Sequence, residues 1–140
     1  MLRFTVSAFF CLLLFACEKE PEAVSPDAII GNWSSDHITV TMPDGEVLLD
    51  TLHPYHHIGI REDRFFYYTY RTGSWELDHR NLKVMYGDSS FGDVIYEIVS
   101  VTDEKLILRS EGGPLQCLCP APDVEPNTQL VITETFLSED

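Results

Sequence analysis

The stretch Val94-Ile95-Tyr96-Glu97-Ile98-Val99-Ser100-Val101-Thr102-Asp103-Glu104-Lys105-Leu106-Ile107-Leu108-Arg109-Ser110 decides the fold. It contains two runs rich in β-branched and other apolar residues, Val94 to Val101 and Glu104 to Ser110, on either side of the turn-forming pair Thr102-Asp103. Such runs predict two antiparallel strands joined by a tight turn. Because no apolar pattern at helical spacing extends beyond two turns, we expect an all-β chain.

Seven further segments have the same composition and end at turn residues. They are Asn32 to Met42, Glu46 to His53, His57 to Ile60, Arg64 to Arg71, Ser74 to Leu77, Asn81 to Tyr86 and Thr128 to Phe136. Eight or nine short strands with mostly tight connections are typical of an up-and-down antiparallel meander, which must close into a barrel or cover its edges. The pattern predicts one such domain over residues 28–137, long enough for a single core.

The N-terminus has the three parts of an export signal. Arg3 is the positive charge, Phe4 to Phe15 is almost wholly apolar, and the small residue Ala16 precedes Cys17. A helix of about 13 residues rises roughly 20 Å, too little to cross an apolar bilayer core of about 30 Å. Residues 1–16 are therefore predicted to be a signal peptide that is removed.

Leu14-Phe15-Ala16-Cys17 resembles the lipobox of bacterial lipoproteins. The resemblance implies that Cys17 is lipidated and anchors the protein to a membrane, and the alternative is an ordinary secretory signal. Residues 17–27 are polar and contain two prolines, so we expect an acidic tether. Its start, Glu18-Lys19-Glu20, is similar to the export signals of surface lipoproteins in Bacteroidetes-type bacteria, which implies an outer-membrane location facing the cell surface or the periplasm.

The chain is strongly acidic. Its formal charge is −14, and it becomes −15 when Arg3 leaves with the signal peptide. Binding to nucleic acid and adsorption to anionic lipids both depend on Lys and Arg, so we reject nucleic acid as a partner. The charge favours a soluble, monomeric exported domain, and calcium or a cationic surface are the alternative partners.

Ile30-Gly31-Asn32-Trp33 is similar to the Gly-x-Trp opening of lipocalins. The segments 73–77, 82–84 and 96–108 resemble later strands of small lipocalin-like domains in Bacteroidetes lipoproteins. The resemblance implies a lipocalin-like β-barrel in which Trp33 plugs the closed end against an arginine from a late strand. Arg109 is the candidate for that arginine.

The segment from Glu111 to Asn127 is longer than a tight meander turn and contains Cys117-Leu118-Cys119. An oxidising location favours a local disulfide between Cys117 and Cys119. Pairing with another chain, reduced thiols and a metal site are the alternatives. The histidines of His53-Pro54-Tyr55-His56-His57 lack a typical zinc spacing, and as strand neighbours His56 and His57 are expected to face opposite ways. We therefore expect solvated histidines, no metal and no cofactor.

The sequence carries no catalytic motif. Gly87-Asp88-Ser89-Ser90 is similar to a hydrolase nucleophile block, but the last histidine, His79, precedes it, so the triad order does not fit. The chain is therefore not expected to be an enzyme, and no catalytic residue is assigned.

The aromatic run Phe65-Phe66-Tyr67-Tyr68-Thr69-Tyr70 indicates a binding role. Small barrels either fill their interior or hold one small apolar ligand. Phe65 and Tyr67 are expected to point inward with Trp75, and together with Trp33 they are the candidate ligand-binding residues. The alternative function is a protein or glycan adaptor, with a filled barrel that acts through its surface and the 111–127 loop.

Overall fold

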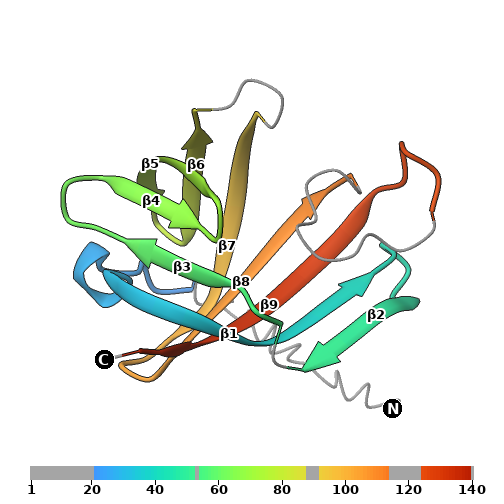
Figure 1. The fold of residues 1–140 in the computed structure, drawn as a ribbon, viewed down its shortest axis with the longest axis horizontal. Helices are drawn as coiled ribbons and strands as arrows, with labels where there is room; N and C mark the ends of the chain where they lie inside the picture. The colour runs from blue at the N-terminus through green and yellow to red at the C-terminus, as the bar shows by residue number, and fades with distance from the viewer. Residues whose placement is uncertain (1–20, 53, 88–91, 114–123, 140) are drawn as a thin grey trace, which may run out of the picture.

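The computed structural model describes residues 21–52, 54–87, 92–113 and 124–139. Within these ranges the chain forms one 3-10 turn and nine antiparallel strands, which confirms the predicted all-β meander (Figure 1). The elements are η1 (Pro26–Ala28), β1 (Gly31–Thr41), β2 (Val47–Leu52), β3 (His57–Ile60), β4 (Phe65–Tyr68), β5 (Arg71–Asp78), β6 (Asn81–Tyr86), β7 (Asp93–Val101), β8 (Lys105–Gly112) and β9 (Leu130–Ser138).

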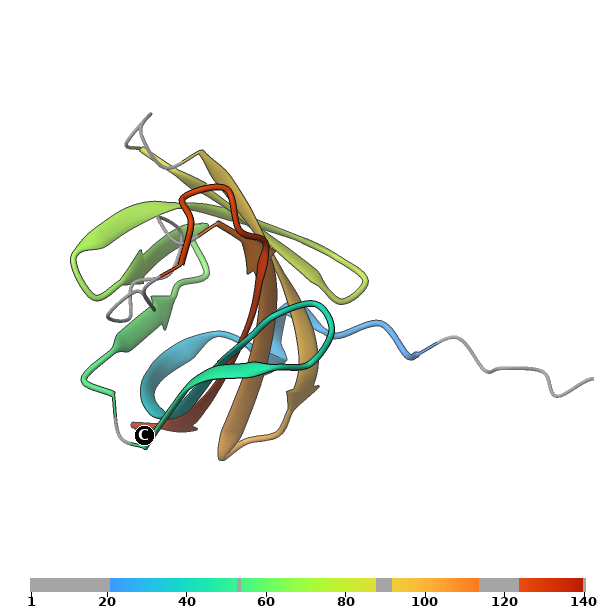
Figure 2. The same ribbon diagram turned by 90° about the vertical axis from the view of Figure 1, so that its right-hand side faces the viewer.

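Eight of the strands close into a barrel. Neighbours from β3 to β9 pair in sequence order, and β9 returns to pair with β1. The other edge of β1 has two partners, because Gly31–Ser34 pair with β3 and His37–Thr41 pair with β2. The β1–β2 hairpin therefore extends out of the ring, and the outer edge of β2 has no partner strand in the described part of the chain (Figures 1 and 2).

The two ends of the barrel differ. At the closed end, where β1 begins and β9 ends, Trp33 Nε1–H donates to the backbone oxygen of the buried Ile29 at 3.0 Å. Trp75 is also buried there, and its Nε1–H donates to Arg61 O at 2.9 Å. The opposite, open end has the β1–β2 and β4–β5 turns and the ends of β6 and β8.

The predicted contact between Trp33 and Arg109 is wrong. Arg109 lies on the outer face of β8, because its neighbours Leu108 and Ser110 take the inward positions of the alternating strand. An arginine does cover a tryptophan at the closed end, but the pair is Arg64 over Trp75, with 4.5 Å between the guanidinium carbon and the ring centroid.

The predicted orientation of β4 is also wrong. Phe66 and Tyr68 are buried inside the barrel, whereas Phe65 is 42% exposed and Tyr67 is half-buried. Alternation separates the two faces of a strand but does not say which face is interior. The pairing decides it, because Phe66 lies opposite Gly73, which is on the same face of β5 as the buried Trp75.

Strand β4 ends earlier than predicted. The expected strand Arg64 to Arg71 ends at Tyr68, and Thr69 takes a left-handed φ of 52°, which leaves Tyr70 97% exposed. The next strand, predicted from Ser74 to Leu77, is longer, because β5 runs from Arg71 to Asp78 and includes Gly73. A Cβ at Gly73 would lie 2.4 Å from Met85 O, so glycine is needed for the close approach of β5 and β6.

Candidate functional site

A carboxylate is buried inside the open half of the barrel. Glu134 of β9 points inward and is 5% exposed. The Tyr68 hydroxyl donates to its Oε2 at 2.7 Å, and the Ser35 hydroxyl donates to its Oε1 at 2.5 Å. His56 Nδ1 lies 3.0 Å from Oε1 and donates when it carries the proton. Three donors compensate the lost hydration of the carboxylate.

The cluster Ser35–His56–Tyr68–Glu134 sits where β1 changes partners. The β1–β9 register shifts between Ser35 and His37, and Ser35 N–H donates to His56 O at 2.8 Å just before β3 begins. The Tyr68 hydroxyl lies 2.9 Å from His56 Nδ1. The cluster thus joins β1, β4, β9 and the residue before β3.

His56 and His57 face opposite sides of the sheet, as predicted for strand neighbours. His56 faces the interior, and His57 faces outward, with its Nδ1 2.6 Å from Glu139 Oε1. The expectation of solvated histidines is therefore wrong for His56, because Glu134 provides a buried acceptor for it. His53 lies outside the described residues.

A second polar pair lines the same interior. The hydroxyls of Tyr86 and Tyr96 lie 2.9 Å apart. Burial raises the pKa of Tyr86 to about 12, although the nearby Arg71 lowers it in part. Burial also raises the pKa of Tyr96, with the neighbouring Tyr86 adding to the effect, and raises the pKa of Tyr68, with Glu134 adding. These hydroxyls stay protonated at neutral pH, so that Tyr68 donates to Glu134 and one of Tyr86 and Tyr96 donates to the other.

Little space remains between these side chains. A cavity of about 10 Å³ is lined by residues that include Tyr68, Tyr96, Ser110 and Glu134. That volume holds about one water molecule, whereas sites for small molecules measure about 300–1,000 Å³. This cavity is therefore too small for a small-molecule ligand.

The four predicted ligand-binding residues do not share a site. Trp33 and Trp75 belong to the core of the closed end, and Phe65 points outward. The Tyr67 hydroxyl donates to Asn32 Oδ1 at 3.1 Å. The buried polar residues were missed, although a glutamate at an inward position of β9, between Ile132 and Phe136, is a signal that sequence reading can use.

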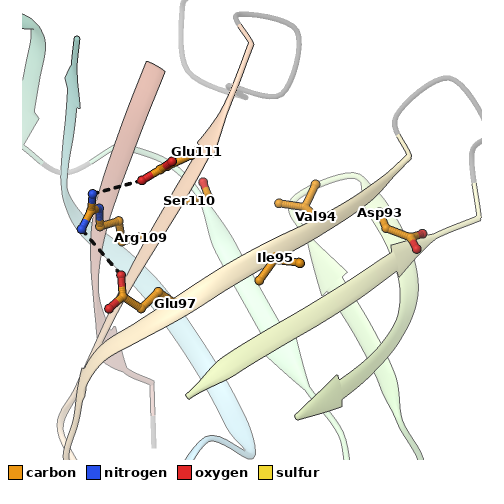
Figure 3. Close-up of a pocket in the computed structure, with 7 residues that line it drawn as sticks. All are labelled: Asp93, Val94, Ile95, Glu97, Arg109, Ser110 and Glu111. Carbon is orange, nitrogen blue, oxygen red and sulfur yellow. Dashed lines mark hydrogen bonds and ion pairs between the residues drawn. The ribbon is translucent and has the colours of Figure 1, made fainter. Parts of the chain in front are cut away.

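A hollow opens in the wall of the barrel where β7 and β8 separate. Their pairing runs from Val101↔Leu106 to Tyr96↔Ser110 and stops there. Continued register would place Ile95 opposite Glu111, but the two strands diverge instead (Figure 1). We call the resulting hollow of about 380 Å³ the β7–β8 wedge (Figure 3). It is lined by Asp93, Val94, Ile95, Glu97, Arg109, Ser110 and Glu111.

The wedge combines unpaired strand edges, an apolar side chain and charges. The edges of residues 93–95 and 111–112 that face each other have no partner strand in the described ranges. Ile95 is 58% exposed. Arg109 lies between two acids, 3.7 Å from Glu97 and 3.1 Å from Glu111 (Figure 3). Such exposed ion pairs add little stability, so a ligand can replace them at low cost.

The interior cluster does not have the arrangement of a nucleophilic triad. Ser35 donates to the carboxylate, and His56 contacts the same carboxylate oxygen. A triad instead needs the hydroxyl to donate to the imidazole, so this geometry supports a buried carboxylate and not an activated serine.

Several predicted sites lie outside the described residues. These are the signal peptide, the lipidation residue Cys17, and Cys117 and Cys119 with most of their loop. In the residues that are described, no three His, Cys, Asp or Glu side chains are placed to hold a metal ion. The same residues include no helix with the length and apolar character needed to cross a membrane.

Comparison with models of protein families found no match, and comparison with curated proteins found none either.

Proposed function

We propose that this chain is an exported, lipid-anchored binding module that contacts a partner protein through its outer surface. One observation carries the proposal. The interior cavity beside Tyr68, Tyr96 and Glu134 measures about 10 Å³, whereas the β7–β8 wedge, which opens in the wall between two strands, measures about 380 Å³. A barrel with so small an interior cavity and a hollow in its wall suits an adaptor better than a carrier of a small apolar ligand.

The wedge favours an extended segment of the partner. Among the described residues, the facing edges of β7 and β8 have no partner strand beyond Tyr96 and Ser110, which suits recognition by strand addition. The exposed Ile95 offers an apolar contact to such a segment. The carboxylates of Asp93, Glu97 and Glu111 favour a segment that carries lysine or arginine.

The anchor part of the proposal is supported by sequence. The lipobox resemblance names Cys17 as the lipidated residue, and the polar residues after it separate the lipid from the barrel. Two or three acyl chains, at about 0.8 kcal/mol per buried CH₂, hold a protein stably on an outer membrane that faces the cell surface or the periplasm.

The test uses a photo-crosslinking amino acid in the full-length chain, produced in its own host. It is placed at Ile95 in the wedge and, as a matched control, at Val99, which is exposed on the same strand away from the wedge. We expect a discrete crosslinked protein from position 95 that is absent from position 99. The yield of that product should decrease when Asp93 and Glu111, which line the wedge together with Ile95, are both changed to lysine.

A carrier of a small ligand would give a different result. If position 95 yields no crosslink beyond that at position 99, and native mass spectrometry shows a small molecule bound to the purified chain, the carrier function replaces the adaptor.

A further inference from the structure

The segment that precedes β1 is bound to the closed end of the barrel. Arg80, in the β5–β6 turn, holds it. Its Nη1–H donates to Glu22 O at 3.1 Å, its Nε–H to Ile98 O at 2.8 Å and its Nη2–H to Val99 O at 2.9 Å. One guanidinium therefore joins the N-terminal segment to β7, and we call this contact the Arg80 clasp.

Further contacts continue along the same segment. Val24 N–H donates to His79 O at 2.9 Å, and the Val24 side chain packs against the main core. After η1, Ile29 is fully buried and accepts the hydrogen bond from Trp33. The contacts of the barrel thus begin at Glu22, before the predicted domain start at 28, and the segment is held at both of its ends.

We propose that the barrel stands on the membrane in one orientation, with its closed end toward the bilayer, and that the Arg80 clasp fixes this orientation. The proposal rests on lipidation of Cys17. Only four residues lie between Cys17 and Glu22, and the five steps from one to the other, at about 3.5 Å each, reach roughly 18 Å at most. A docked segment with so short a connection keeps the turns at 61–64, 79–80 and 102–104 near the headgroups.

Attraction to lipids does not explain this orientation. The turns of the closed end carry the acids Glu62, Asp63, Asp103 and Glu104 beside a smaller number of cations. Such a surface is not polybasic, and polybasic segments are what bind anionic headgroups. The covalent anchor and the Arg80 clasp must therefore set the orientation.

The orientation places the β7–β8 wedge away from the membrane. The wedge lies where β7 begins and β8 ends, at the open end of the barrel. The nine residues of β7, at about 3.3 Å each, run roughly 30 Å from the closed end to that point. A partner in the aqueous space reaches the wedge without meeting the lipid surface.

The test uses the full-length lipidated chain in nanodiscs that contain a lipid with a gadolinium-chelating headgroup. Amide NMR signals near the headgroups relax faster. We expect several-fold stronger relaxation at Asp63, His79 and Asp103 than at Gly45 and Tyr70. Equal relaxation at both ends would overturn the fixed orientation.

Two variants test whether the Arg80 clasp sets the orientation. Arg80→Ala should make the relaxation at the two ends similar, whereas Arg109→Ala, which removes a surface arginine that pairs with Glu97 and Glu111, should leave the difference intact. An Arg80→Ala protein that keeps the wild-type difference would show that the clasp does not set the orientation. Should Arg80→Ala fail to fold, twelve Gly and Ser residues inserted between Glu20 and Pro21 should remove the difference by lengthening the connection.

The mass of the N-terminal peptide separates the two proposals. If the peptide lacks acyl mass and the chain leaves the nanodiscs, both the anchor and the orientation are overturned. If acyl mass is present and both ends relax equally, the anchor stands and only the orientation is overturned.

Discussion

The two halves of the barrel are stabilised by different kinds of contact. The closed half is packed with apolar side chains such as Trp33, Trp75 and Ile29, and it holds the N-terminal segment. The open half buries Glu134 with hydroxyl and imidazole partners, and its wall opens between β7 and β8. Apolar packing therefore stabilises the closed end, whereas hydrogen bonds to a buried carboxylate stabilise the half in which the barrel wall is incomplete.

The sharpest test of this comparison uses adjacent residues of β4. Phe66 is fully buried and Phe65 is 42% exposed. Phe66→Ala should lower the free energy of unfolding by about 3–5 kcal/mol, and Phe65→Ala by about 1 kcal/mol or less. Urea titrations measure both. Equal losses would show that β4 is turned differently from the described structure.

The buried tyrosines predict sensitivity to alkali. Because folding raises the pKa of Tyr86 from about 10 to about 12, the folded state binds more protons than the unfolded state in that range. The stability from this group is complete below pH 10 and is lost as pH rises toward 12, at a cost of about 3 kcal/mol. Tyr68 and Tyr96, with raised pKa values, act in the same direction.

Unfolding titrations between pH 8 and 12 measure this effect. Tyr86→Phe should reduce the slope of stability against pH without abolishing it. A slope that Tyr86→Phe leaves unchanged would contradict the burial of its hydroxyl.

Disrupting the polar cluster should lower the free energy of unfolding less than truncating a residue of the apolar core. Glu134→Gln replaces one of the two accepting oxygens with an NH₂ group, so one of the two hydroxyls, of Tyr68 or Ser35, loses its acceptor. The substitution should lower the free energy of unfolding by about 2 kcal/mol. Glu97→Gln is the matched control, because it weakens an exposed ion pair with Arg109 and should cost about 0.5 kcal/mol or less. Thermal melts compare them, and similar costs would mean that the cluster does not support the open half.

The smallest effect is expected outside the ring. His37 of β1 pairs with Asp50 of β2, and both side chains are exposed. Asp50→Asn should change the free energy of unfolding by about 0.5 kcal/mol or less. A loss of several kcal/mol would show that the β1–β2 hairpin contributes to the stability of the barrel as strongly as its core does.

Sequence reading could predict the strands but not how they meet. Alternation and turn residues located each strand, since both are local signals. They did not predict which face of Phe65–Tyr68 is interior, because that depends on the pairing with β5. They also placed the start of the next strand at Ser74, although β5 begins at Arg71 and includes Gly73, which lies close to Met85 of β6.

The candidate sites depend on contacts between distant residues, which explains why they were missed. Glu134 meets Ser35 across 99 residues and His56 across 78. The Arg80 clasp joins residues 58 apart, and the wedge arises because one ladder stops early. No single segment encodes these features.

The open edge of β2 affects how copies of this protein behave at high concentration. Val47 and Leu52 are exposed on that strand, which contains neither lysine nor proline to discourage the growth of a sheet. Copies are kept apart mainly by their shared charge of −14, which salt screens beyond about 10 Å at 0.1 M. Colloidal stability should therefore be lost first in strong salt, or near the isoelectric point of 4.5, before the barrel itself unfolds.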